Sequence, residues 1–147
     1  MKRKRVKGKS CLGAFLFLSC ALSTVGYAGT WKNTGKNWQY LAESGEAQKA
    51  WISDNGSWYF LDENTGVMKD KWLFYQDKWY FLNPQSDGSR GKMLTGWQWV
   101  DGYCYFLKED GELLLSAITP DGYQVNELGQ WVSEDGKAIH VEGKGYS

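Results

Sequence analysis

The sequence predicts an all-β fold in which short β-hairpins stack on one another as a solenoid. The main observation is three tryptophan pairs, each spaced by seven residues and recurring every 20 to 21 residues: Trp31 with Trp38, Trp51 with Trp58, and Trp72 with Trp79. A fixed short period is typical of a solenoid, because one unit is too small to bury its apolar face alone. The 18 glycines and the 16% of aromatic residues agree, since they fit tight turns between strands with large side chains.

Four aligned segments predict four hairpins, at residues 31–41, 51–61, 72–82 and 97–107. In the second segment, Asp54-Asn55-Gly56 is a turn signal between two aromatic-rich stretches, which is typical of a β-hairpin. The other three have turn residues at the same place: Asn33-Thr34-Gly35, Gln76-Asp77-Lys78 and Asp101-Gly102. A second Gly-centred turn follows each hairpin, and a linking segment that carries Met68 or Met93 comes after it.

The repeat is irregular at two places. The third connection is four residues longer than its neighbours, and a surface loop around residues 84–91 can absorb this at little entropic cost. From Ile118 the pattern decays into a different hairpin that ends at Trp131, as expected of a cap. We therefore expect a capped solenoid at residues 29–132 and a polar tail at residues 133–147, whose last residues should be poorly ordered.

Residues 1–28 are predicted to be a secretory signal peptide, so that the mature protein is secreted. Six of the first ten residues are basic and none is acidic, an apolar run follows at residues 11–22, and Gly26 and Ala28 supply the small residues needed before a cut after Ala28. The apolar run is shorter than the roughly 20 residues of a membrane span. Lipidation at Cys20 is an alternative, although the large residues before it fit that signal poorly.

The charge of the mature chain is negative. Without residues 1–28 it carries 11 Lys and Arg against 17 Asp and Glu, a net charge of about −6. This disfavours nucleic acid as a partner, whose binding depends on basic residues, and is compatible with a cationic ligand or with a solvated acidic surface. Cys104 would be the only Cys left, so no internal disulfide is expected and the residue should be a small buried hydrophobe.

Nothing in the sequence favours catalysis or a cofactor. His140 is the only His, and a metal site needs several His or Cys. Spacing alone leaves open a pair of Cys104 with His140, or a pair of carboxylates, but the acidic residues stand in turns, where Asp is favoured by local hydrogen bonding. We therefore predict a non-enzymatic protein without a cofactor or a metal.

The aromatic residues are arranged so that part of them can serve a ligand. Side chains alternate along a strand, so Trp58 and Phe60 share one face of their hairpin while Tyr59 and Leu61 share the other. Where two hairpins stack, two Trp of one unit and one aromatic ring of the next can form a three-walled box. Such a box attracts an easily dehydrated cation, above all a quaternary ammonium group, by about 0.5 to 2 kcal/mol per contact.

The repeats resemble the choline-binding (cell-wall-binding) repeats of streptococci and related Gram-positive bacteria. The match extends from about Gly29 to Leu115, more loosely to Trp131, and is carried by Trp58-Tyr59-Phe60-Leu61, Trp79-Tyr80-Phe81-Leu82 and Met93-Leu94-Thr95-Gly96-Trp97. The resemblance implies a left-handed β-hairpin solenoid of about four repeats with a C-terminal capping hairpin. It also implies binding to phosphocholine on teichoic or lipoteichoic acids, at the cell wall or cell surface.

The resemblance implies three choline-binding sites, each built from two Trp, one aromatic ring of the next repeat and one Met. The sets are Trp31, Trp38, Phe60 and Met68; Trp51, Trp58, Phe81 and Met93; and Trp72, Trp79 and Phe106, with Leu114 in the place of the Met. In the fourth repeat Cys104 replaces the second Trp, so no choline site is expected there. The middle tyrosines are expected to belong to the core: Tyr59, Tyr80 and Tyr105.

The leading hypothesis is a surface protein that several weak phosphocholine contacts anchor to the wall by avidity. Adhesion to a host surface protein is a candidate further role. A carbohydrate (glucan)-binding module is the alternative, because Trp also stacks on sugar faces, although Trp pairs seven residues apart favour choline. A dimerising structural protein is a third hypothesis, since relatives often pair through terminal hairpins.

Overall fold

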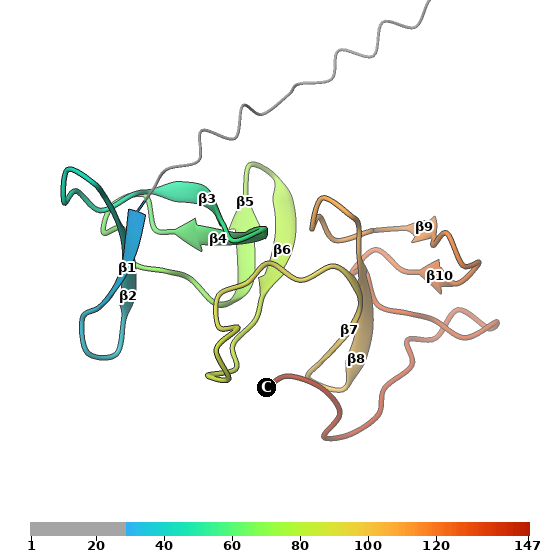
Figure 1. Cartoon of the computed structure of the whole chain (residues 1–147). Helices are drawn as coiled ribbons and strands as arrows, with labels where there is room; N and C mark the ends of the chain where they lie inside the picture. Colours follow the sequence, from blue (N-terminus) through green and yellow to red (C-terminus); the bar gives the residue numbers. More distant parts are fainter. Residues whose placement is uncertain (1–28) are drawn as a thin grey trace, which may run out of the picture.

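The computed structural model describes residues 29–147, and the predicted signal peptide lies outside this range (Figure 1). The described part is all-β, as predicted, with no helix. Its ten strands are β1 (Gly29–Asn33), β2 (Trp38–Ala42), β3 (Ala50–Asp54), β4 (Ser57–Leu61), β5 (Lys71–Tyr75), β6 (Lys78–Leu82), β7 (Gly96–Val100), β8 (Tyr103–Leu107), β9 (Ala117–Ile118) and β10 (Gln124–Val125). Consecutive strands pair antiparallel into five separate hairpins.

The hairpin turns explain how the repeat tolerates different turn sequences. Asn55 and Gly56 close β3–β4 with φ of 47° and 74°, the left-handed backbone of a two-residue hairpin turn. Gln76 and Asp77 adopt the same conformation in β5–β6, with φ of 49° and 60°, although neither is Gly. The strain of two non-Gly residues is outweighed by ten paired strand residues, so the third hairpin forms without the usual signal.

Linking segments join each hairpin to the one before it. Met68 lies in a bridge with Leu61 of its own hairpin, and its N–H donates to the carbonyl oxygen of Trp38 in the preceding hairpin, at 2.8 Å. The same pair of contacts recurs one repeat later at Met93, whose N–H donates to Trp58, and again at Leu113, whose N–H donates to Trp79. This recurring backbone bond fixes the spacing between neighbouring units of the stack.

The core lies between the hairpins. Leu61 and Leu82 are fully buried and Leu107 is 1% exposed, which confirms that the leucines ending the second, third and fourth repeats belong to the core, whereas Leu41 of the first repeat is half-buried. They contribute to three successive clusters along the stack, together with the buried rings Tyr40, Tyr59, Phe60 and Phe81. Burial of these side chains between neighbours supplies the stability that a single hairpin lacks.

The C-terminal tail differs from the expectation of poor order. Residues 133–147 fold back along the fourth hairpin, where Tyr146 bridges Val100 and His140 bridges Tyr103. The Tyr146 ring lies 5.4 Å from that of Phe81 and packs against the buried cluster that contains Phe81 and Leu107. Backbone bonds to the fourth hairpin and one aromatic contact therefore order a segment whose polar composition suggested a loose end.

Candidate functional site

Aromatic rings line cavities at the seams between hairpins. The first cavity, of about 390 Å³, is lined by Trp31 of β1, Trp38 of β2, Tyr59 of β4 and Met68. The rings of Trp31 and Tyr59 meet edge to face at 4.9 Å. Three of the four residues predicted for the first site are thus brought together, and the exception is Phe60.

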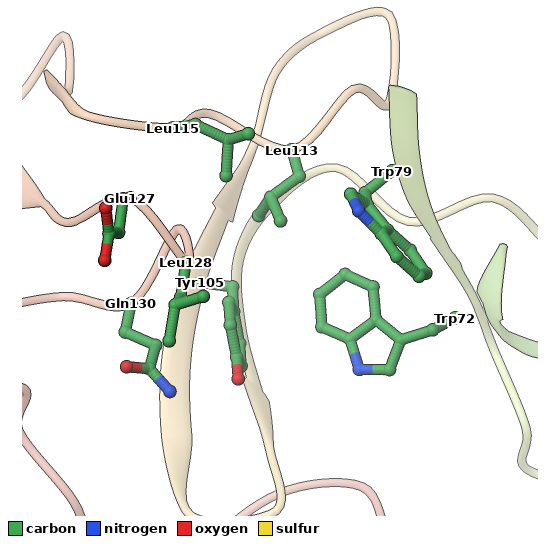
Figure 2. Close-up of a pocket in the computed structure, with 8 residues that line it drawn as sticks. All are labelled: Trp72, Trp79, Tyr105, Leu113, Leu115, Glu127, Leu128 and Gln130. Atoms are coloured by element: carbon green, nitrogen blue, oxygen red, sulfur yellow. The ribbon is translucent and has the colours of Figure 1, made fainter. Parts of the chain in front are cut away.

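The third predicted site has the same design (Figure 2). Trp72 and Trp79 stand at 90° to each other with centroids 6.2 Å apart, and Tyr105 of the next hairpin lies 4.9 Å from Trp72. Figure 2 shows Tyr105 facing the two indoles across the cavity, whose volume is about 380 Å³. Leu113 and Leu128 complete an apolar wall, and Glu127 adds a carboxylate.

At the second seam the rings also meet, since Trp51 contacts Tyr80 of the next hairpin edge to face at 4.9 Å. Met93 packs against the buried cluster beside Trp51, and its N–H donates to the Trp58 carbonyl oxygen. The structure therefore places Trp51, Trp58 and Met93 at one seam, as the repeat pattern predicts.

The third wall of each box is a middle tyrosine and not the predicted phenylalanine. Phe60, Phe81 and Phe106 pack edgewise on the first Trp of their own hairpin, at 5.2, 4.9 and 5.2 Å. The reason is that hairpins stack front to back, so the Trp face of one unit meets the opposite face of the next. That opposite face carries Tyr59, Tyr80 and Tyr105, which were expected to be core only.

The fourth wall of the third site also differs by one residue from the prediction. Leu113, and not Leu114, bridges Leu107 in the way that Met68 bridges Leu61. Leu113 lines the cavity, whereas Leu114 donates its N–H to the carbonyl oxygen of Phe106. The register of the linking segment decides this, and the sequence alone did not reveal it because two leucines are adjacent.

A further aromatic cavity lies at the fourth repeat, where no site was expected. Its volume is about 330 Å³, and its walls are Trp97, Trp99, Cys104, Asp121, Tyr123 and Trp131. Trp99 pairs directly with Cys104 across the strands, so the fourth repeat has its second Trp on the neighbouring strand. Trp131 belongs to the cap, and its backbone N–H donates to the Cys104 carbonyl oxygen. Its ring centroid lies 5.6 Å from that of Tyr123. The signal for this cavity was Trp99 itself, two residues after the repeat Trp.

The fourth cavity carries a negative charge on its wall. Asp121 accepts hydrogen bonds from the Thr119 hydroxyl at 2.6 Å and from Trp97 Nε1 at 2.9 Å, and these lower the pKa of its carboxyl. The carboxylate is therefore ionised at neutral pH, which favours a cation. Lys144 acts in the opposite direction, because its Nζ lies 4.0 Å over the Trp99 ring. Cys104 is 4% exposed and burial raises its thiol pKa, so it is the small buried hydrophobe that was expected.

Glycines of the second turn fit against the linking residues. A Cβ on Gly111 would lie 2.3 Å from Met93 Sδ, and one on Gly91 would lie 2.4 Å from Met68 Sδ. Both glycines have positive φ, of 83° and 81°. In the third and fourth units the second turn therefore packs directly on the Met of the preceding unit, and only Gly allows this approach.

Gly111→Ala is expected to destabilise the protein by about 2 to 4 kcal/mol, from backbone strain of about 1 to 2 kcal/mol together with the displacement of Met93. The matched control is Gly122→Ala, which has the same kind of backbone, with φ of 91°, but no atom within 4 Å of the added Cβ. Urea unfolding of the two variants separates strain from contact. Equal losses of unfolding free energy would show that the approach to Met93 contributes nothing.

Within residues 29–147 no helix is long and apolar enough to cross a membrane. The same residues hold no group of three or more His, Cys, Asp or Glu side chains that could bind a metal ion.

Comparisons with known proteins identify the repeats. Two family models, each described as a choline-binding repeat, match residues 28–72 and 97–131. The choline-binding domain of Spr1274 from Streptococcus pneumoniae is 36% identical over 58% of this chain and 96% of that domain, with a TM-score of 0.51. The modular Cpl-1 endolysin is 24% identical, covers 80% of this chain and 38% of its own, and shares the fold with a TM-score of 0.54.

Choline-binding protein F from Streptococcus pneumoniae is 33% identical over 70% of this chain, with a TM-score of 0.37, and the present chain spans 40% of its length. A search among curated protein sequences gave no match. Matches to the repeat models at both ends of the solenoid, and the near-complete coverage of a pneumococcal choline-binding domain, agree with the hairpin geometry. The chain belongs to the choline-binding repeat family.

Proposed function

We propose that this protein is a non-catalytic wall-binding module that is secreted through residues 1–28 and held on teichoic or lipoteichoic acids by their phosphocholine groups. The observation that carries the proposal is the box at the first seam, where Trp31, Trp38, Tyr59 and Met68 surround one cavity. Related boxes recur at the next seams in step with the repeat.

The chemistry of the boxes suits a trimethylated ammonium group. Such a cation loses water easily and lies against aromatic faces, at about 0.5 to 2 kcal/mol per ring. Two or three rings supply about 4 kcal/mol, which corresponds to a dissociation constant of about 1 mM. The pKa values of Tyr59, Tyr80 and Tyr105 are raised, chiefly by burial, so these rings remain neutral phenols. Weak sites on one chain then act together on a polymer that presents many choline groups.

The fourth cavity is a further candidate for the same ligand. It combines the rings of Trp97, Tyr123 and Trp131 with the carboxylate of Asp121. A cation in this cavity would gain from both the rings and the ionised carboxylate. Lys144 over Trp99 weakens that attraction, so we expect this cavity to bind choline more weakly than the first and third.

Isothermal calorimetry with choline chloride tests the proposal, and saturable binding of three or more molecules at millimolar ligand is expected. The control ligand is 3,3-dimethylbutanol, which has the shape of choline without its charge. If the neutral analogue bound equally well, the boxes would be ordinary apolar pockets. Binding of a glucan oligosaccharide in competition with choline would instead favour a carbohydrate-binding module.

A further inference from the structure

The first cavity differs from the others because the long third connection reaches it. Seven residues lie between Asn83 and Gly91, whereas three lie between Asp62 and Gly66 at the equivalent turn. Both turns are closed by the same backbone bond, in which the Gly N–H donates to the carbonyl oxygen of the first residue, at 2.7 and 2.8 Å. The four additional residues therefore leave the solenoid frame unchanged and form a loop at residues 84–90.

Side chains within the loop hold its shape. Asn83 is 5% exposed; its Nδ2 donates to the Ser89 hydroxyl, and its Oδ1 accepts the N–H of Gln85 at 3.0 Å. The Asp87 carboxylate accepts the Ser89 N–H at 2.9 Å. These bonds shape the loop, and three of its residues line the first cavity: Ser86, Gly88 and Arg90.

Arg90 brings a positive charge to the cavity wall. Its Nε and Nη2 both contact Oδ2 of Asp70, at 2.7 and 2.6 Å, which orients the guanidinium. The side chain is 38% exposed, and among residues 29–147 no partner is found for Nη1. A guanidinium has five N–H donors, so donors remain for another anion. The third and fourth cavities have an acidic residue on their walls instead, Glu127 or Asp121.

We infer that the first cavity recognises phosphocholine as one unit, with the trimethylammonium group in the box of Trp31, Trp38 and Tyr59 and the phosphate on the guanidinium of Arg90. This inference rests on the proposed function. A two-carbon link joins the two charged groups of phosphocholine, so its recognition needs an aromatic box and an anion donor in the same cavity. Arg suits the second task because its planar fork matches two phosphate oxygens. The 390 Å³ of the cavity lies within the range of small-ligand sites.

Calorimetry on the full chain with Trp58→Ala and Trp79→Ala tests the inference, because the second and third boxes then each lack a wall. Phosphocholine is expected to bind about tenfold more tightly than choline. This gain in affinity is at the low end for hydrogen bonds to a charged group, because Asp70 already offsets part of the charge of Arg90. Arg90→Gln should remove this preference without weakening choline itself, since a positive charge on the cavity wall opposes a cation, as Lys144 does in the fourth cavity. Arg90→Lys should retain part of it, since the charge remains without the fork.

Lys92→Gln is the matched control, because it removes an equal charge two residues away from a side chain that does not line the cavity. Inorganic phosphate alone should not bind measurably, since it lacks the group that the rings hold. Equal affinities for choline and phosphocholine, or equal effects of Arg90→Gln and Lys92→Gln on the preference, would overturn the inference. Absence of choline binding in the unsubstituted protein would contradict the proposed function instead.

Discussion

A variant with Trp38→Ala, Trp58→Ala and Trp79→Ala is expected to lose retention on a quaternary-amine resin and to keep its fold. Trp38 and Trp79 line the first and third cavities, and Trp58 stands at the equivalent position of the second hairpin; Trp79 is 41% exposed, and none of the three belongs to the buried clusters. The first Trp of each pair, in contrast, packs on the core. Removing one ring costs about 0.5 to 2 kcal/mol per site, and because the sites act together on the resin the losses multiply.

The measurement is the choline concentration needed to elute the protein, together with the far-ultraviolet circular dichroism spectrum and the unfolding midpoint. Phe74→Ala is the control, because Phe74 is an exposed aromatic residue in contact with Trp79 that lines no described cavity. It should elute like the unsubstituted protein. A folded triple variant that still needed the same concentration of choline would show that the indoles do not form the ligand sites.

The hairpins could be predicted from the sequence because their cause is local. Strand alternation and turn residues act within about ten residues, so the four aligned segments give hairpins whose bounds lie within two residues of the expected ones. The Trp pairs of the first and third boxes follow equally well, since Trp31 with Trp38, and Trp72 with Trp79, share one face of one hairpin.

The wrong choice of Phe60 over Tyr59 has a different cause. Alternation decides which residues share a face, but it does not decide which face meets the preceding hairpin. That choice depends on the direction in which the linking segment turns, which is set by the backbone bond from Met68 to Trp38 across the seam. Once the stacking is known to be front to back, the Tyr face follows at every repeat.

Residues distant in sequence were the hardest to predict. Arg90 reaches a box begun by Trp31, and Trp131 completes one begun by Trp97, through a loop and a cap that do not obey the repeat. The ordered tail belongs to the same class, because it is held by backbone bonds to the fourth hairpin and by the contact of Tyr146 with Phe81. Composition describes such segments on average, whereas their placement depends on single side chains.

Leu82→Ala is expected to lower the free energy of unfolding by about 2 to 5 kcal/mol, the usual cost of a cavity left by a buried Leu. Leu82 is fully buried with Phe60 and Leu73, and it bridges Met93 in the segment that bonds back to Trp58. The described part has 119 residues, for which a total stability of about 5 to 15 kcal/mol is typical. The Leu82 side chain, at the middle of the stack, therefore accounts for a large share of the total free energy of unfolding.

Choline binding should offset part of the stability that Leu82→Ala removes. Choline that binds only the folded state should restore about 2.7 kcal/mol at one site when its concentration is a hundred times the dissociation constant. Urea unfolding of Leu82→Ala with and without choline measures both effects. Ile118→Ala is the control, because this side chain is 70% exposed and its loss should change the unfolding free energy by no more than about 0.5 kcal/mol.

Because each hairpin of a solenoid is stabilised only by its neighbours, a loss between the second and third hairpins should separate the unfolding of the first two hairpins from that of the hairpins after them. A single sharp transition with an unchanged midpoint would mean that the stack does not depend on this contact.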